Sequence, residues 1–456
     1  MKKLLLAVFS IATTFSLYAQ REVPQERMEQ IYEEVKTPYK YGLAVAPADN
    51  YHKIDCPTVF RQGDKWLMTY VVYNGKGGTD GRGYETWIAE SDNLLEWRTL
   101  GRVLSYRDGK WDCNQRGGFP ALPDMEWGGS YELQTYKGRH WMTYIGGEGT
   151  GYEAVKAPLY VGLAWTKGNI STAHEWESLD KPILSIHDKD AQWWEKLTQY
   201  KSTVYWDKDK TLGAPFVMYY NAGGHHPETN LKGERVGIAL SKDMKTWKRY
   251  SGNPVFAHEA DGTITGDAHI QKMGDVYVMF YFSAFEPSRK YKAFNTFAAS
   301  YDLVNWTDWK GADLIIPSKN YDELFAHKSY VVKHDGVVYH FYCAVNNAEQ
   351  RGIAIATSKS MGRSAVRFPV PESKNRRQIM TLNEGWKTWI TEATHLKGNF
   401  MMPAKTVNIP HNWDDYYGYR QLTHGNLHGT AMYVKDFTAD VKSGKRYFLR
   451  FEGVGT

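Results

Sequence analysis

Cysteine is scarce in this chain of 456 residues, and its scarcity argues against two classes of protein. The three cysteines, Cys56, Cys113 and Cys343, are too few for the disulfide framework of a small secreted domain. They also lack the CxxC spacing of a zinc site. The sequence therefore predicts neither a disulfide scaffold nor a set of metal ligands.

A strong charge of one sign and a long apolar run are also lacking. Lys and Arg together exceed Asp and Glu by only 5, which argues against nucleic acid as the main partner. The apolar run Leu4–Ala19 follows Lys2 and Lys3 and is too short for a membrane span of about 20 residues. A basic start, a short apolar stretch and a small residue at its end are typical of a secretory signal peptide. We predict a signal peptide over residues 1–19 and a periplasmic or secreted protein without a membrane span.

A five-fold repeat dominates the rest of the sequence. A turn glycine followed by aromatic and β-branched residues, as in "GDKWLMTY", recurs at Gly63–Tyr70, Gly138–Tyr144, Gly213–Tyr220, Gly274–Tyr281 and Gly336–Tyr342. Such runs are typical of strands, and each has another strand before it and a third after it. Tryptophan marks a fourth strand in "LLEWRTL", "HEWESL", "KTWKRY" and "VNWTDW". Four strands repeated five times predict an all-β chain with a five-bladed β-propeller over residues 41–367.

The innermost strand of each propeller blade starts at one face of the ring, close to the central axis. Aligned on the turn glycines, these strands start at Asp55, Tyr131-Glu132, Tyr200-Lys201, Asp267-Ala268-His269 and His327. Ionisable groups are rarely buried without a partner, so their convergence predicts a ligand site. Candidate catalytic residues are Asp55, Asp267, His327 and Glu132, and candidate substrate contacts are Lys201 and His269. The alternatives are structural: a strand-capping or turn aspartate, and a histidine packed in the interior.

Loops between the second and third strands, and links between blades, return to the same face. They carry four further candidate substrate contacts, Trp193, Trp194, His225 and Arg351. The two tryptophans suit a stacking platform for a sugar ring, with packing between blades as the alternative. His225 is followed by His226, and the side chains of adjacent histidines rarely point to one ion. A sugar contact is therefore favoured over a metal site for His225. Arg351 is suited to a hydroxyl or carboxylate.

Three motifs carry a resemblance to a known group. "KIDCPTVF", "ITGDAHIQ" and "LFAHKSYVVKHDGVVYHFYCAV" resemble the five-bladed glycoside hydrolases of families 43 and 117. The resemblance implies inverting hydrolysis with Asp55 as the general base. Family 43 has a glutamate acid in blade four and an aspartate in blade three, whereas this chain has Asp267 and Lys201. The pattern is more similar to family 117, in which a histidine has been assigned the acid role, so the identity of the acid stays open.

The C-terminal part carries a second resemblance. "LNEGWKTW", "VNIPHNW" and "GTAMYVKDF" are similar to the N-terminal sugar-binding domain of family 2 glycosidases such as β-galactosidases, which is a jelly-roll β-sandwich. The sequence stops inside that pattern. We expect an N-terminal extension over residues 20–40, a linker over 368–380 and an incomplete β-sandwich over 381–456.

The leading functional hypothesis is a glycoside hydrolase that cleaves O-glycosidic bonds of plant or algal oligosaccharides or polysaccharides. It requires no cofactor, and a structural calcium on the propeller axis is compatible with the fold. Two alternatives stay open. Because blade three offers Lys201 in place of an acid, one alternative is a carbohydrate-binding propeller without activity. The other is a phosphorylase on the same fold, with basic residues that hold phosphate.

Overall fold

The computed structural model describes residues 22–76, 81–153, 157–370, 380–393, 403–412, 429–443 and 446–451. The predicted signal peptide lies outside these residues. No helix within the described residues is long and apolar enough to cross a membrane. The chain divides into two units, Met1–Pro371 and Glu372–Thr456, and the division falls inside the predicted linker.

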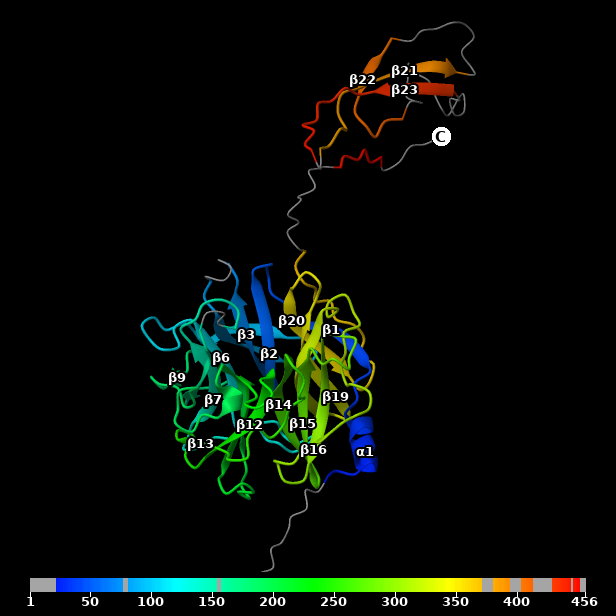
Figure 1. Cartoon of the computed structure of the whole chain (residues 1–456). Helices are drawn as coiled ribbons and strands as arrows, with labels where there is room; N and C mark the ends of the chain where they lie inside the picture. Colours follow the sequence, from blue (N-terminus) through cyan, green and yellow to red (C-terminus); the bar gives the residue numbers. More distant parts are fainter. Residues whose placement is uncertain are drawn as a thin grey trace, which may run out of the picture. The chain divides into compact units, whose positions relative to one another are not determined.

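Unit 1 is a five-bladed β-propeller (Figure 1). Blade one comprises β2 (His52–Gln62), β3 (Lys65–Asn74), β4 (Tyr84–Ser91) and β5 (Arg98–Leu104). Blade two comprises β6 (Gln115–Pro120), β7 (His140–Gly147), β8 (Tyr160–Thr166) and β9 (Glu177–Ser178). Blade three comprises β10 (Thr198–Trp206), β11 (Phe216–His225), β12 (Lys232–Ser241) and β13 (Trp247–Arg249). Blade four comprises β14 (Thr263–Met273), β15 (Val276–Ala284), β16 (Ala293–Ser300) and β17 (Thr307–Asp308).

Blade five closes the ring with a strand from the start of the chain. Its strand order is β1-β20-β19-β18, with β18 (Phe325–His334) innermost, then β19 (Val337–Val345) and β20 (Arg351–Thr357). The outermost strand is β1 (Tyr39–Val45), which pairs antiparallel with β20. This explains why only four of the five repeats carry the tryptophan of an outer strand. Pairing the two ends of the propeller covers an otherwise open sheet edge.

Blade two departs from the predicted alignment. Its innermost strand is β6, and β6 pairs with β7 in unbroken register from Gln115 to Pro120. The stretch Tyr131-Glu132, predicted to start this strand, instead lies in the connection between β6 and β7, where Arg61 and Glu132 form a single parallel bridge. The alignment failed because the connection is long and because "QRGGFP" lacks the aromatic signature of a strand.

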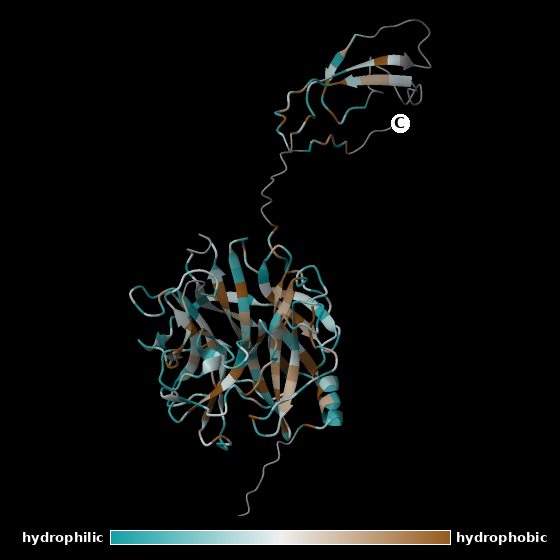
Figure 2. Ribbon diagram, viewed as in Figure 1, coloured by the Kyte–Doolittle hydropathy of each residue, from teal (hydrophilic) through white to brown (hydrophobic). Residues whose placement is uncertain are grey.

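Buried apolar side chains form the core, and Figure 2 shows hydrophobic residues along the strands of the propeller. The helix α1 (Gln25–Val35) adds to this core, although residues 20–40 carried no predicted element. Met28, Ile31 and Val35 recur on one helical face and are buried, as an amphipathic helix requires. Tyr32 on the same helix stacks on Trp309, with ring centroids 5.1 Å apart.

Unit 2 contains a small antiparallel sheet. Its strand order is β22-β21-β23, with β21 (Trp386–Ala393) between β22 (Lys405–Val407) and β23 (Gly429–Val434). The three motifs similar to family 2 glycosidases fall on or beside these strands. Several large apolar side chains after β23 are exposed, among them Phe448 and Phe451.

The docking of α1 predicts a measurable loss of stability for Ile31→Ala. The side chain is fully buried, so its truncation should reduce the free energy of unfolding by about 2–5 kcal/mol. The control is Glu29→Ala, at an exposed position of the same helix. Its free energy of unfolding should stay within about 0.5 kcal/mol of the wild-type value. Chemical denaturation measures both. Equal stability of the two variants would contradict the docking of the helix.

Candidate active site

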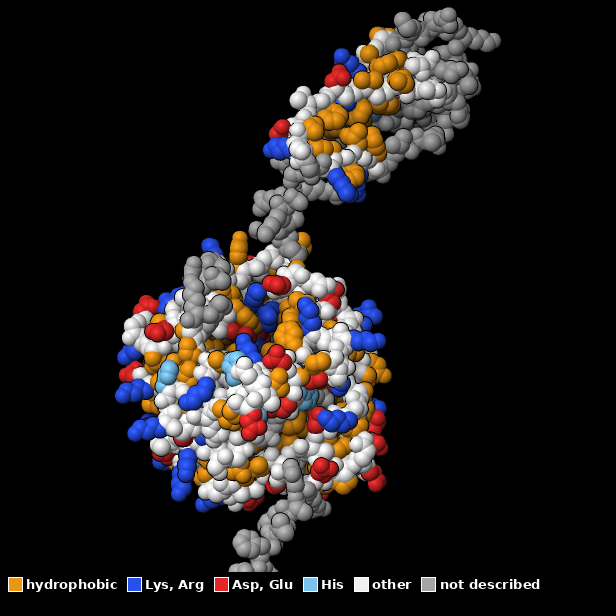
Figure 3. All heavy atoms as spheres, viewed as in Figure 1, with side chains coloured by type: hydrophobic (Ala, Val, Ile, Leu, Met, Phe, Trp, Pro, Cys, Tyr) orange, Lys and Arg blue, Asp and Glu red, His pale blue; other side chains and the backbone are white. Residues whose placement is uncertain are grey.

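The innermost strands of four blades carry a β-bulge close to their start. The register shifts between Asp55 and Thr58, Gln199 and Ser202, Gly266 and His269, and His327 and Tyr330. Cys56, Asp267 and Lys328 have positive φ angles of 51°, 57° and 60° there, a conformation that costs energy for residues other than glycine. Bulges re-aim side chains and are common beside active sites. Around these bulges charged side chains are buried, and Figure 3 shows acidic and basic groups together in a hollow of the propeller.

Asp55 is buried, and both of its carboxylate oxygens are occupied. Oδ1 accepts a hydrogen bond from the backbone N–H of Cys56 at 2.9 Å. Oδ2 lies 2.8 Å from Nζ of Lys328 and 3.4 Å from Nη1 of Arg351. It also accepts a hydrogen bond from the hydroxyl of Tyr152, which in turn accepts one from Arg351 at 2.8 Å.

These neighbours decide the charge of Asp55. Burial alone raises the pKa of this carboxyl group, but Lys328 and Arg351 outweigh burial and hold the pKa well below its usual range. Burial lowers the pKa of Lys328, but Asp55 opposes burial and the net pKa is well above the ordinary value. A carboxylate that is always ionised and already saturated with donors is a weak base near neutral pH. The geometry therefore favours Asp55 as the anchor of two cations over its predicted role as general base.

Lys328 connects Asp55 to a second carboxylate, that of Glu153. Nζ of Lys328 lies 3.3 Å from Oε1 of Glu153. Glu153 directly follows Tyr152 in the link between β7 and β8 and has a φ of 56°. Its side chain is 38% exposed, so solvent and a ligand can reach it. The ion pair with Lys328 thus fixes the carboxylate of Glu153 at the edge of the group of buried charges.

A further carboxyl group of the site, that of Glu234, comes from blade three. It lies at the start of β12, where Gly233 and Glu234 pair in parallel with β14 of the next blade. Burial, followed by the nearby charge of Glu153, raises the pKa of Glu234 to about 8. Asp267 adds to this rise, against a hydrogen bond from Nδ2 of Asn221 at 3.1 Å. Glu234 is therefore largely protonated at neutral pH and can donate a proton.

Asp267 lies close enough to Glu234 to act on its charge, and it keeps one oxygen unused. Its side chain is buried, and Oδ2 has no hydrogen-bond partner among the described residues. The nearest cation is Nζ of Lys201, at 3.7 Å. Burial raises the pKa of Asp267, and the opposing effect of Lys201 does not cancel the rise. A buried oxygen without a donor is suited to accept a hydrogen bond from a sugar hydroxyl.

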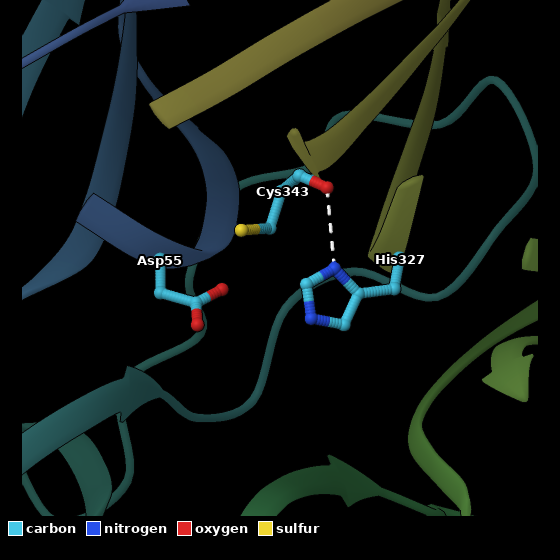
Figure 4. Close-up of side chains that lie close together, drawn as sticks. All are labelled: Asp55, His327 and Cys343. Carbon is cyan, nitrogen blue, oxygen red and sulfur yellow. Dashed lines mark hydrogen bonds between the residues drawn. The ribbon is translucent and has the colours of Figure 1, made fainter. Parts of the chain in front are cut away.

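His327 is neutral in this site, although the carboxylate of Asp55 lies close to it. Its Nδ1 lies 3.3 Å from the carbonyl oxygen of Cys343, to which it donates (Figure 4). Burial lowers the pKa of His327 to about 3, because the charge of Asp55 is offset by Lys328 and Arg351. An imidazole with such a pKa is not the proton donor of a reaction at neutral pH.

Asp55, His327 and Cys343 bring three potential metal-ligand atoms within 4.8 Å of one another (Figure 4). The surroundings disfavour a cation there. Lys328 and Arg351 already neutralise Asp55, and burial raises the pKa of the Cys343 thiol well above its ordinary value. A metal requires the thiolate, so the three residues do not form a suitable metal centre.

Two predicted residues lie apart from this group. His269 is buried, stacks on Tyr330 with ring centroids 3.8 Å apart, and has its Nε2 3.1 Å from the carbonyl oxygen of Val331. Burial lowers its pKa to about 3, and its contacts are those of a packing residue between blades four and five. Glu132 is exposed in the connection between β6 and β7, so the reason for its prediction, an innermost-strand position, does not hold.

The predicted aromatic platform divides into one packing residue and one accessible residue. Trp194, in the short 3₁₀ helix η2 (Trp193–Glu195), is fully buried against Tyr220. Trp193 is partly exposed and contacts His226 edge to face, with the guanidinium of Arg235 4.9 Å from its ring centroid. His225 is exposed at the end of β11.

Sequence reasoning missed Glu153 and Glu234. Both follow from a topological rule that was already available, since links between the second and third strands of a blade return to the site face. Glu153 lies in that link of blade two, and Glu234 opens the third strand of blade three. The signal was a carboxylate in such a link. The repeat pattern aligns only the innermost strands, so it does not point to a carboxylate in such a link.

Similar proteins are found among the solved structures. No protein-family model matches the chain, and no curated protein does. A solved structure of a complex of BT0996 with RGII is 95% identical over 77% of this chain and all of its own, with a TM-score of 0.77. Another, named "Glycoside hydrolase", has the same identity and coverage and a TM-score of 0.76. A family 117 glycoside hydrolase from the marine bacterium Zobellia galactanivorans is 12% identical over 71% of this chain and 91% of its own, with a TM-score of 0.49.

A five-bladed propeller with carboxyl groups around a hollow does not by itself define a reaction class. The 95% identity to a glycoside hydrolase over the whole of that structure makes the assignment specific. The protein belongs to the glycoside hydrolases.

The saturated contacts of Asp55 predict a loss of stability for Asp55→Asn. The change leaves two buried cations without their charge partner, so at pH 7 the free energy of unfolding should fall by about 3–5 kcal/mol. Because the pKa of Asp55 is depressed in the folded protein, its stabilising effect is present above the unfolded pKa of about 3.9 and is lost as the pH falls further.

The difference in the free energy of unfolding between wild type and Asp55→Asn should therefore become smaller below about pH 4. Urea denaturation at several pH values measures it. The control is Asp92→Asn, which removes an exposed partner of Lys65 and should cost at most about 1 kcal/mol. A constant difference at every pH would show that the ion pairs are not its source.

Proposed function

We propose that this glycoside hydrolase cleaves a glycosidic bond of an RGII oligosaccharide, with Glu234 as the general acid and Glu153 as its partner. The observation that carries the proposal is the placement of Glu234, which accepts a hydrogen bond from Asn221 at 3.1 Å and lies near the charge of Glu153. Burial and Glu153 raise its pKa to about 8, while Lys328 holds Glu153 in an ion pair. Two neighbouring carboxyl groups in different protonation states are what glycoside hydrolysis requires.

The proposed reaction separates the two proton transfers. Glu234 gives its proton to the oxygen of the leaving group as the bond to the anomeric carbon breaks. On the other side of the sugar, Glu153 accepts a proton from water as the water oxygen bonds to the anomeric carbon. This sequence inverts the anomeric configuration, as the resemblance implies, and NMR of the first product formed tests it. Retention would make Glu153 a nucleophile instead.

The remaining charged groups have supporting roles in the proposal. Lys328 and Arg351 are held by Asp55 and orient Glu153 and Tyr152. Oδ2 of Asp267, which lies 3.7 Å from Lys201 and has no hydrogen bond among the described residues, accepts a hydrogen bond from a sugar hydroxyl. No cofactor is required, because carboxyl groups supply both proton transfers.

The substrate class is supported by the neighbour at 95% identity, whose name records a complex with RGII. The place of action is supported by the sequence alone, since residues 1–19 have the pattern of a secretory signal peptide. We propose that the protein acts in the periplasm or outside the cell.

The acid role of Glu234 predicts a dependence on the leaving group for Glu234→Gln. With an RGII oligosaccharide, whose leaving group needs a proton, kcat should fall about 10²–10⁴-fold. With an aryl glycoside that carries a dinitrophenolate leaving group, the loss should be tenfold or less. Initial rates in phosphate-free buffer measure both.

Glu132→Gln is the control for this series and should behave as wild type with both substrates. An equal loss of rate with both leaving groups would contradict the acid role. A rate that appears only when phosphate is added would favour the phosphorylase. Oligosaccharide binding without turnover by the wild type would favour the non-catalytic alternative.

The raised pKa of Glu234 predicts the alkaline side of the pH profile. The acid must be protonated, so kcat should fall as the pH rises through about 8. Asp267→Asn removes a charge that raises this pKa and should shift the alkaline limb to lower pH. A full pH profile of kcat in both proteins measures the shift, and the exposed change Asp261→Asn is the control. An unmoved limb in Asp267→Asn would show that Asp267 does not act on the acid.

A further inference from the structure

A groove apart from the hollow runs along the outer edge of blade five. Its volume is about 820 Å³. One wall is β1 with the two residues before it, and another is the link between β17 and β18 at residues 314–321. Residues 360–368, which follow β20, form the third wall and cross β1 through a bridge between Val366 and Leu43.

All the charged residues that line the groove are basic. Its lining contains four basic residues and neither Asp nor Glu, and the basic residues are Lys40, Lys319, Arg363 and Arg367. Lys40 is already paired with the buried Asp322 beneath the groove. The other three are exposed, and none of them pairs with a carboxylate among the described residues. Three cations held around one hollow attract an anionic ligand.

The other lining side chains indicate what kind of anion fits. Tyr39 is 50% exposed, and Tyr41 is partly exposed beside it on β1. Tyrosine rings offer a flat apolar face together with a polar hydroxyl. Asn320 adds an amide group that can donate to and accept from hydroxyls. Rings for stacking, an amide for hydroxyls and guanidinium groups for carboxylates together match a saccharide that contains uronic acids.

The groove also connects with the active site through one short turn. Asn346 lies in the turn between β19 and β20, and its side chain is hydrogen-bonded to Gln350. The next residue, Arg351, contacts Asp55 in the active site. A saccharide long enough to occupy the groove would therefore approach the rim of the active site over this turn.

We propose that this groove of blade five is a second saccharide-binding site, specific for chains that carry uronate carboxylates. Lys319, Arg363 and Arg367 bind the carboxylates, and Tyr39 stacks on a sugar ring. The site retains an acidic substrate while the active site acts on it. The proposal does not depend on which carboxyl group is the catalytic acid.

The test is calorimetric titration of the full chain with tetragalacturonic acid, with maltotetraose as the neutral probe. We expect the wild type to bind the acidic probe and to bind the neutral one at least tenfold more weakly. The triple variant Lys319→Ala/Arg363→Ala/Arg367→Ala should lose affinity for the acidic probe at least tenfold. Its rate with a small aryl glycoside should not change, because that substrate occupies only the active site.

A matched variant separates the groove from the overall charge of the protein. Lys242→Ala/Lys248→Ala/Lys290→Ala removes three exposed cations elsewhere and should bind the acidic probe as the wild type does. Tyr39→Ala, which leaves the charge intact, should also weaken binding. Melting temperatures verify that all variants are folded. Equal losses in the two triple variants, equal affinity for both probes, or no binding of the acidic probe at millimolar concentration would each overturn the proposal.

Discussion

The active site depends on one buried cation, Lys328. Its Nζ lies 2.8 Å from Asp55 and 3.3 Å from Glu153, so it joins a buried carboxylate of blade one to an accessible one from blade two. A pair of opposite charges about 4 Å apart is worth about 4 kcal/mol at the effective dielectric constant near a protein surface. This attraction opposes the cost of burying the two charges and the cost of the strained backbone of the bulge that carries Lys328, about 1–3 kcal/mol. The bulge of blade five and the ion pairs of Lys328 are therefore coupled.

The same arrangement gives the two glutamates different protonation states. Glu153 shares Lys328 with Asp55, whereas Glu234 accepts a hydrogen bond from Asn221 and has its pKa raised by burial. Negative charge on Glu153 and Asp267 then disfavours a further charge on Glu234. A proton donor and an ionised carboxylate thus arise from one residue type because their surroundings differ. Asp55 contributes indirectly, since without it Lys328 and Arg351 would lack a fixed partner.

Much of the fold could be predicted from the sequence, because the repeated turn glycine and aromatic strand recur in every blade. The propeller follows from that pattern, and so does the position of Asp55, Asp267 and His327 within the first few residues of the innermost strands of blades one, four and five. The closure of the ring by β1 could not be predicted, because β1 comes from the start of the chain and no repeat adjoins it in the sequence. Blade two was misaligned because its innermost strand is the short, glycine-containing β6, which carries a weak hydrophobic signal.

Only part of the site could be predicted from the sequence, and the reason differs from the one that applies to the fold. Position near the axis can be inferred from strand order, but protonation depends on which charges lie within a few ångströms. Asp55 and Glu234 illustrate this, since burial raises both pKa values and only the neighbouring cations reverse the shift for Asp55. Those neighbours come from different blades, and no local sequence pattern records them. For the same reason the sequence, which placed His327 among the candidate catalytic residues, did not indicate that burial keeps it neutral.

The most direct test of this account is an NMR titration of the Glu234 carboxyl carbon in protein with ¹³C-labelled glutamate. Comparison with Glu234→Gln assigns the signal, and the same titration is repeated in Glu153→Gln. The account predicts a pKa of about 8 in the wild type and a lower value once the charge of Glu153 is removed. A pKa near the ordinary glutamate value in the wild type, or one that does not move in Glu153→Gln, would contradict it.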